Sequence, residues 1–240
     1  MDVLVISGGS SRQRFDERPV SCPEIDETPR EELVGEHPEA AAPAVELYTG
    51  REHVRIEAAV ADIEAVTEVT WRLLSPGYGV VAPEDELVAY DCPLSDVDAL
   101  RARADRLGLA PGEMTRQETR VAVARSIGMH DAVRAALSTV PDLALIALPT
   151  DLLTGIGPAL DRIPDGTTAI AIAAASATDS LGDSHWLPAT DTERTLLESN
   201  WVTLRGDLLA GLADGITSRS DLDRIAERPQ RAYFTSLGMG

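Results

Sequence analysis

Four short apolar runs, separated by longer segments with helical periodicity, constrain the fold of this chain most strongly. The runs cover residues 2–7, 69–75, 143–148 and 168–174. Each ends in small or turn-forming residues, which is typical of buried strands in a parallel sheet. Because strands alternate with helices, the sequence predicts an α/β fold: a mainly parallel, Rossmann-like sheet of four to five strands with helices on both faces.

The length of 240 residues suits a single domain covering residues 1–240. Residues 12–43 are rich in proline, glutamate and arginine without a usable period, which predicts an extended acidic and proline-rich loop. Residues 87–90 are expected to add an edge strand to the sheet. A capping-box pattern at Thr190 and Glu193 predicts the start of a C-terminal helical segment over residues 190–240.

Helical spacing between the runs predicts further helices. They are expected from Tyr48–Gly50 onward, over 95–107 with Ser95 as the capping residue, over 117–137 with a break near Gly128, over 155–162 and over 190–216. Residues 177–189 are polar and are predicted to form a loop.

Charge is the strongest compositional signal. The chain holds 40 acidic and 21 basic residues, and every basic residue is arginine, which gives a net charge of −19. An acidic excess of this size favours adaptation to concentrated salt, in which repulsion is screened over roughly 3 Å at 1 M. A GC-rich genome, which favours arginine over lysine, is the alternative. Without lysine, the chain has neither a Schiff-base amine nor a Walker-A phosphate site.

The first residues are predicted to form a strand rather than a basic leader, and no apolar run reaches about 18 residues. We therefore expect a cytoplasmic protein with no membrane partner. In that compartment, Cys22 and Cys92 are not expected to form a disulfide. The two cysteines and four histidines show no metal-ligand spacing, so no metal is assigned.

Ligands of open parallel sheets bind beyond the carboxyl ends of the strands. The residues at these ends are small or polar, and the candidate ligand-binding residues among them are Ser7, Gly8, Gly9, Ser10, Ser75, Gly77, Gly79 and Thr150. Glycines there allow a ligand to approach the backbone closely. A tight turn leaving a buried strand is the alternative. The first loop does not match the dinucleotide fingerprint, so no cofactor is assigned.

The start of the helix after the first loop adds four candidates. Tyr48, Thr49 and Gly50 lie where free backbone amides attract anions, and Arg51 contributes a fork of donors. An ordinary Thr49 cap with a packed Tyr48 is the alternative.

The loop after the second strand supplies the candidate catalytic residues, Tyr78 and Asp91. Tyr78 would stack on a ligand or donate a hydrogen bond, and Asp91 would handle protons. A core-plugging tyrosine and a solvated acid are the alternatives.

Two motifs carry a family resemblance. Residues 75–91, with Ser75, Tyr78, Gly79, Asp85 and Tyr90 in order, resemble the YaaA-type peroxide-stress family. The sequence Leu-Tyr-Thr-Gly at 47–50 is similar to a motif of archaeosine-synthase-associated domains. The resemblance covers residues 1–100 and implies an α/β domain connected with nucleic acids or modified bases. Those relatives carry a cysteine and a lysine in the first loop, so a lysine-dependent mechanism cannot operate here.

Three functions follow. The first is a protein that binds a nucleotide or nucleobase-like small molecule, as an enzyme of nucleic-acid base modification or glycosidic-bond chemistry. The second is a non-catalytic DNA-binding stress-response protein, which the net charge opposes; the one local basic cluster, Arg101, Arg103 and Arg106, is expected to be a solvated helix face. The third is a pseudo-enzyme that binds a partner. The first requires the loops after the first two strands to meet around one cavity.

Overall fold

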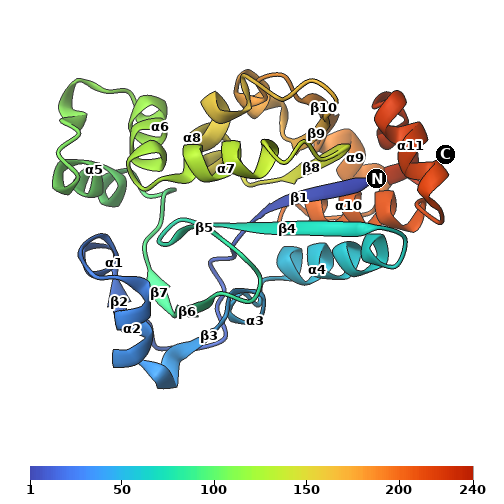
Figure 1. Cartoon of the computed structure of the whole chain (residues 1–240). Helices are drawn as coiled ribbons and strands as arrows, with labels where there is room; N and C mark the ends of the chain where they lie inside the picture. The colour runs from blue at the N-terminus through green and yellow to red at the C-terminus, as the bar shows by residue number, and fades with distance from the viewer. Residues whose placement is uncertain (240) are drawn as a thin grey trace.

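The computed structural model describes residues 1–239; Gly240, the last residue of the predicted C-terminal helical segment, lies outside the described residues. A six-stranded sheet has the order β10-β9-β8-β1-β4-β5 (Figure 1). The strands are β1 (Asp2–Gly8), β4 (Glu68–Ser75), β5 (Gly79–Val81), β8 (Leu143–Ala147), β9 (Thr168–Ala173) and β10 (His185–Pro188). The predicted α/β class with a mainly parallel sheet is confirmed. The predicted strand count was too low, and β5 pairs antiparallel with β4.

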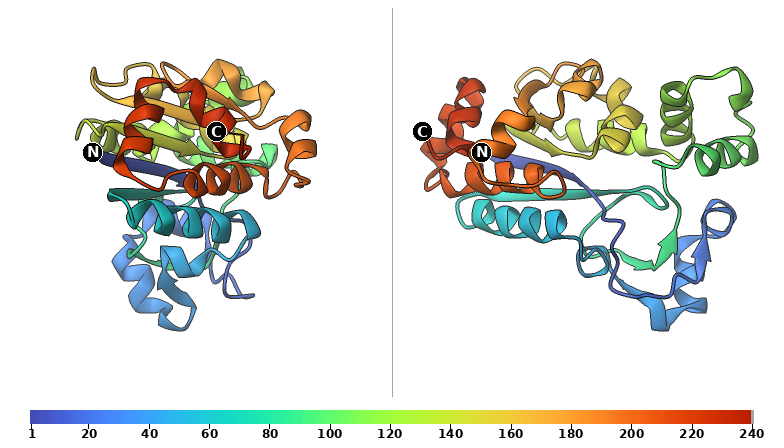
Figure 2. Two further views of the ribbon diagram at one scale, coloured as in Figure 1. Left: turned by 90° about the vertical axis from the view of Figure 1, so that its right-hand side faces the viewer. Right: turned by 180° about the vertical axis from the view of Figure 1, so that it is seen from behind.

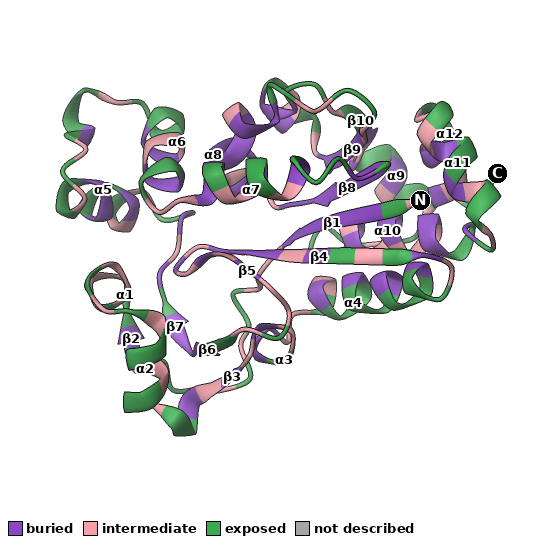
Figure 3. Ribbon diagram, in the orientation of Figure 1, coloured by how far each residue is buried: buried purple, intermediate pink, exposed green. Residues whose placement is uncertain are grey.

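Helices cover both faces of the sheet (Figure 2). Along β1, Val3 and Val5 pack towards α4 (Arg51–Glu64) and α10 (Leu204–Asp214). Leu4 and Ile6 pack on the opposite side, in one cluster with α6 (Arg116–Ser126), α7 (Met129–Leu137) and α8 (Thr150–Leu160). These four strand residues are at most 1% exposed, which explains why the first apolar run is unbroken (Figure 3).

The segment between β1 and α4, residues 9–50, is the inserted segment of the fold. It contains β2 (Val20–Ser21), α1 (Cys22–Glu27), α2 (Arg30–Glu36), the 3-10 turn η1 (Pro38–Ala40), β3 (Ala41–Pro43) and α3 (Ala44–Leu47). The prediction of an extended loop over 12–43 is therefore wrong. Its short elements carry too few residues to show a period, and they are ordered by pairing with a distant part of the chain.

That distant part is the predicted edge strand at 87–90. Its residues form β6 (Glu86–Val88) and β7 (Tyr90–Asp91). They do not join the main sheet: β6 pairs antiparallel with β3, and β7 pairs parallel with β2. The inserted segment and residues 86–91 thus build a second, smaller layer beside the carboxyl ends of the main strands (Figure 1).

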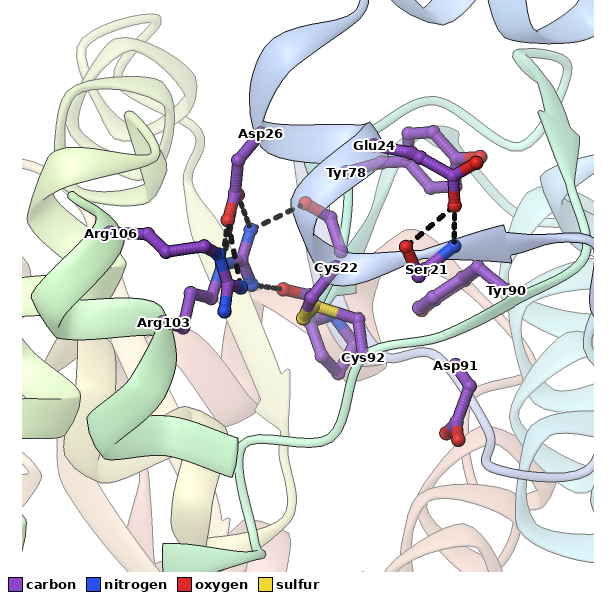
Figure 4. The surroundings of a disulfide bond; sticks show 12 residues. Ser21, Cys22, Glu24, Asp26, Tyr78, Tyr90, Asp91, Cys92, Arg103 and Arg106 are labelled. Atoms are coloured by element: carbon purple, nitrogen blue, oxygen red, sulfur yellow. Dashed lines mark hydrogen bonds and ion pairs between the residues drawn. A yellow bond between two sulfur atoms is a disulfide. The ribbon is translucent and has the colours of Figure 1, made fainter. Parts of the chain in front are cut away.

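A disulfide joins Cys22 and Cys92, with their Cα atoms 4.8 Å apart (Figure 4). The prediction that these cysteines stay unpaired is wrong. The ladder between β2 and β7 pairs Ser21 with Asp91, so the next residue of each strand is a cysteine and the two lie side by side. The register of this strand pair cannot be predicted from the sequence, because the two cysteines are 70 residues apart in the chain. Disulfides are typical of oxidising compartments, so the compartment argument used against the bond does not hold for this pair.

Arg103 on α5 (Val97–Arg106) fastens the smaller layer to the main domain. It was expected on a solvated face, but only 1% of it is exposed. Its guanidinium donates to Asp26 Oδ1 at 2.6 Å and to the carbonyl oxygens of Pro76 at 2.5 Å and Gly77 at 3.2 Å. Figure 4 shows Arg106 also pointing towards Asp26, at 3.4 Å. Of the predicted solvated face, Arg101 and Arg106 are exposed as expected, whereas the prediction is wrong for Arg103, which forms a buried ion pair that joins three segments.

Helix boundaries differ from expectation at four places. Asp96, not Ser95, caps α5, and α8 begins at Thr150 rather than near 155. The predicted loop at 177–189 contains the 3-10 turn η3 (Ala175–Ser180) and the edge strand β10. The predicted helix over 190–216 is divided into α9 (Asp191–Leu196) and α10. The predicted break near Gly128 is confirmed, since that residue has φ +77° between α6 and α7.

The remaining elements are the 3-10 turn η2 (Pro111–Glu113) and the helices α11 (Arg219–Glu227) and α12 (Gln230–Ser236). Across residues 1–239, no helix combines the length and the apolar character needed to cross a bilayer.

Replacing Arg103 with Met should lower the free energy of unfolding by about 3–5 kcal/mol, because Asp26 would stay buried with only the more distant Arg106, at 3.4 Å, as a counter-charge. Urea unfolding followed by circular dichroism measures the loss. Arg101→Met, on the exposed side of the same helix, is the matched control and should change the value by no more than about 0.5 kcal/mol. A loss below about 1 kcal/mol for Arg103→Met would show that the pair does not hold the layers together.

Removing the disulfide by Cys22→Ala with Cys92→Ala should cost about 2–4 kcal/mol, since the bond closes a long loop of the unfolded chain. Reductant should lower the unfolding midpoint of the wild-type protein and leave that of the double variant unchanged. Equal midpoints for the wild type with and without reductant would contradict the bond.

Candidate functional site

The order of the strands locates a crevice at the carboxyl edge of the sheet. From β1 the chain proceeds to β4 on one side, and later to β8 and β9 on the other. The sheet therefore reverses its winding direction between β1 and β8, and open α/β sheets bind ligands at such a point. The switch-point pocket, as we call it, has a volume of about 340 Å³ and is bordered by the ends of β1, β4 and β8 through Gly8, Pro76 and Pro149.

Two glycines allow the loop after β1 to pack against the start of α4. A Cβ atom on Gly9 would lie 2.5 Å from the Tyr48 ring, and one on Gly50 would overlap the hydroxyl of Ser10. Both positions therefore exclude larger residues. Gly9, Ser10 and Gly50 consequently form one continuous wall of the switch-point pocket.

The amino terminus of α4 opens into this pocket. Gly50 is its N-cap, and no side chain caps the helix, so the predicted Thr49 cap is not formed. Instead, Thr49 lies in a separate shallow hollow beside Arg12 and Asp16. Arg51, the first helical residue, lines the switch-point pocket and has no ion-pair partner among residues 1–239.

A buried chain of hydroxyl groups joins β4, β7 and the inserted segment. The phenol of Tyr90 lies 3.0 Å from that of Tyr48 and 2.8 Å from the hydroxyl of Ser75. Ser75 in turn accepts from the amide of Tyr78 at 3.0 Å. Burial raises the pKa of the Tyr48, Tyr78 and Tyr90 phenols. The three phenols are consequently neutral, and the chain is a structural network in which Tyr90 alone borders the pocket.

Charged side chains line the pocket as ion pairs. Glu52 accepts from Arg205 of α10 at 2.7 Å, and Asp91 lies 3.7 Å from Arg18. Burial raises the pKa of the Glu52 carboxyl, and the Arg205 guanidinium opposes that shift.

A third ion pair lies at the β8 side of the pocket, where Asp151, in the first turn of α8, contacts Arg120 at 2.5 Å. With each acid opposite an arginine, Arg51 supplies the free positive charge of the site.

Buried polar atoms without partners concentrate around this pocket. Within residues 1–239 there are six such side-chain atoms, and three of them belong to pocket-lining residues: Glu52 Oε1, His53 Nδ1 and Arg205 Nε. Since the Val45 carbonyl can only accept, His53 carries its proton on Nε2, 3.0 Å away, and Nδ1 is an acceptor. Burial lowers the pKa of His53, which keeps the ring neutral. Unmet hydrogen-bonding capacity of this kind is typical of functional sites.

The predicted site residues fall into two groups. The switch-point pocket is lined by Gly8, Gly9, Ser10, Gly50, Arg51 and Asp91. The residues that lie outside its lining are Ser7, Tyr48, Thr49, Ser75, Gly77, Tyr78, Gly79 and Thr150.

Most of this second group has a structural position. Ser7 is fully buried and accepts from the Trp71 indole at 2.9 Å. Tyr78 packs edge-on against Tyr90, with ring centroids 5.2 Å apart, and donates to the Val88 carbonyl at 3.2 Å. Gly79 has φ +77°, as the turn into β5 requires.

Sequence reasoning missed several residues of the pocket: Gln13, Arg18, Glu52, His53, Asp151 and Arg205. Glu52 and His53 could have been found, because they directly follow the predicted helix start. Arg205 comes from a helix 153 residues further along the chain than its partner Glu52, and no local pattern marks it. Among residues 1–239 no three His, Cys, Asp or Glu side chains are arranged to hold a metal ion.

The buried phenols determine how the folded protein responds to alkali. Tyr48, Tyr78 and Tyr90 keep their protons above the ordinary pKa of about 10, whereas the unfolded chain loses them there. Above that pH the unfolded state binds fewer protons, so stability should fall as pH rises. Phenolate absorbance from these three residues should appear together with the loss of the circular dichroism signal. Full titration with a midpoint near pH 10 in a still-folded protein would contradict this arrangement.

Comparison with known proteins gives no relative for this chain: no protein-family model matches it, and neither a curated protein nor a solved structure is significantly similar to it.

Proposed function

We propose that this protein binds a small phosphorylated ligand, of mononucleotide size, in the switch-point pocket. One observation carries the proposal: an uncapped helix start, a glycine-lined loop and an unpaired arginine border the same crevice at the switch point of the sheet. Each of these features attracts an anion, and their convergence is the arrangement by which lysine-free α/β sites can hold phosphate.

The phosphate end of the ligand is assigned to α4. Its first-turn amides have no carbonyl partners within the helix, and the 14-residue helix adds a positive partial charge at that end. Arg51 supplies a planar fork of donors, and the acidic side chain next to it, Glu52, is neutralised by Arg205. The first turn of α8 instead presents Asp151, so the opposite side of the crevice is less suited to an anion.

The size and the walls of the pocket favour a small ligand. A volume of about 340 Å³ is at the lower end of the range of about 300–1,000 Å³ for ligand sites. This favours a mononucleotide over a dinucleotide. Pro76, Pro93, Leu94 and Leu152 supply apolar walls for the non-phosphate part of the ligand.

We propose ligand binding rather than a defined reaction. Tyr78, whose hydroxyl was expected to contact a substrate, lies outside the pocket. Asp91, the expected proton-handling residue, is paired with Arg18. The alternative of duplex DNA binding is disfavoured by the net charge of −19, because nucleic-acid affinity depends on a wide basic surface. We also propose that the protein is adapted to concentrated salt, on the acidic composition alone.

Isothermal titration with adenosine and guanosine monophosphates, the matching nucleosides and ribose 5-phosphate tests the proposal, in both dilute and molar potassium chloride. Arg51→Gln should weaken nucleotide binding about tenfold or more and leave nucleoside binding unchanged, since it removes charged hydrogen bonds to phosphate. Arg101→Gln removes the same charge from an exposed position on α5 and is the matched control. The proposal fails if no phosphorylated ligand binds, or if both variants bind the nucleotide as the wild type does.

A further inference from the structure

The connection between α9 and α10, residues 197–203, holds two large apolar side chains in solvent. Trp201 is 56% exposed and Val202 is 66% exposed. Val202 also lines the switch-point pocket, so this connection forms part of its rim. Trp201 directly precedes this rim residue in the chain, although it is not itself part of the pocket lining.

The exposure of these side chains is not a result of a loose loop. Asn200 Oδ1 accepts from the amides of Val202 at 2.9 Å and Thr203 at 3.2 Å. The hydroxyls of Ser199 and Thr203 both donate to the carboxylate of Asp207 on α10.

Asp207 is itself anchored to the body of the fold, because its carboxylate also pairs with Arg55 of α4. The connection is thus tied to both helices that cover this face of the sheet. These contacts hold the backbone of the connection in place, so that the side chains of Trp201 and Val202 stay exposed.

Trp201 already takes part in an interaction that uses its π system. The guanidinium of Arg194 lies 5.3 Å from the centre of the indole ring, which is within range of a cation–π contact. Arg194 is in turn held by Asp191 at 2.6 Å. This contact orients the ring while more than half of the residue stays open.

We propose that Trp201 is a stacking platform for the base of the bound nucleotide, with Val202 in contact with the sugar. The inference rests on the proposed function and extends it: the ligand is a nucleotide with a planar aromatic base, not a simple sugar phosphate. In this arrangement the phosphate lies at Arg51, and the base extends past the pocket-lining residues Arg205 and Val202 to reach Trp201 beyond the rim. Stacking also persists in concentrated salt, where screening weakens charge–charge contacts.

The test compares adenosine monophosphate with ribose 5-phosphate on the full chain, by titration calorimetry and by tryptophan fluorescence. Trp201→Ala should weaken nucleotide binding about tenfold and leave ribose 5-phosphate binding unchanged. Trp201→Phe keeps an aromatic face, so it should retain most of the affinity while losing the ligand-induced change in fluorescence. Phe234→Ala removes another exposed aromatic residue, 50% exposed on α12 and outside this pocket, and is the control.

The outcomes separate the two proposals. If the nucleotide and ribose 5-phosphate bind equally and Trp201→Ala changes neither, the platform is overturned and phosphate binding at Arg51 stands. If the wild type binds no phosphorylated ligand, both proposals fall. If Trp201→Ala abolishes a concentration-dependent dimer in sedimentation while nucleotide affinity stays the same, the exposed residues form a self-association face and the platform is overturned.

Discussion

The ion pair between Arg103 and Asp26 is the contact on which the arrangement of the two layers depends. The Arg103 guanidinium also donates hydrogen bonds to the carbonyl oxygens of Pro76 and Gly77, which directly follow β4. One side chain therefore fixes α1, α5 and the end of a central strand relative to each other. Because both charged groups are withdrawn from water, removing Asp26 leaves the Arg103 guanidinium buried without a carboxylate, and removing Arg103 leaves Asp26 with only Arg106 at 3.4 Å. The wall of the pocket formed by residues 90–95 stays in place as a consequence.

The switch-point pocket depends on that anchoring because its residues come from separate parts of the chain. The sheet contributes strand ends, the inserted segment contributes Gln13 and Arg18, and α10 contributes Arg205. Gln13 shows how closely the layers fit: its amide exchanges two hydrogen bonds of 2.9 Å with the backbone of Tyr90. The site is therefore a property of the assembled fold, and α4 connects the Gly50–Arg51 end of the pocket to the core.

The features that the sequence could predict are those determined by a few consecutive residues. The apolar runs locate four central strands because burial on both faces leaves a signal in a few consecutive residues. The break at Gly128 was predictable because a left-handed backbone favours glycine. The start of α8 carries no standard capping residue, because its N-cap is Pro149, and Pro149-Thr150 therefore predicted only the end of a strand. The site residues Gly8–Ser10, Gly50 and Arg51 could be predicted too, because they lie at a strand end or a helix start that consecutive residues mark. The disulfide, the burial of Arg103 and the pairing of Glu52 with Arg205 depend on register and packing between residues 70 to 153 positions apart.

The two outer strands limit how this protein can associate with others. β5 has three residues and runs against its neighbour, and β10 has four residues that end in Pro188, which offers no amide hydrogen. Short, interrupted borders of this kind are poor templates for an added strand. At the edges of the main sheet, contact with another polypeptide is therefore expected to form through side chains of helices and loops rather than by addition of a strand.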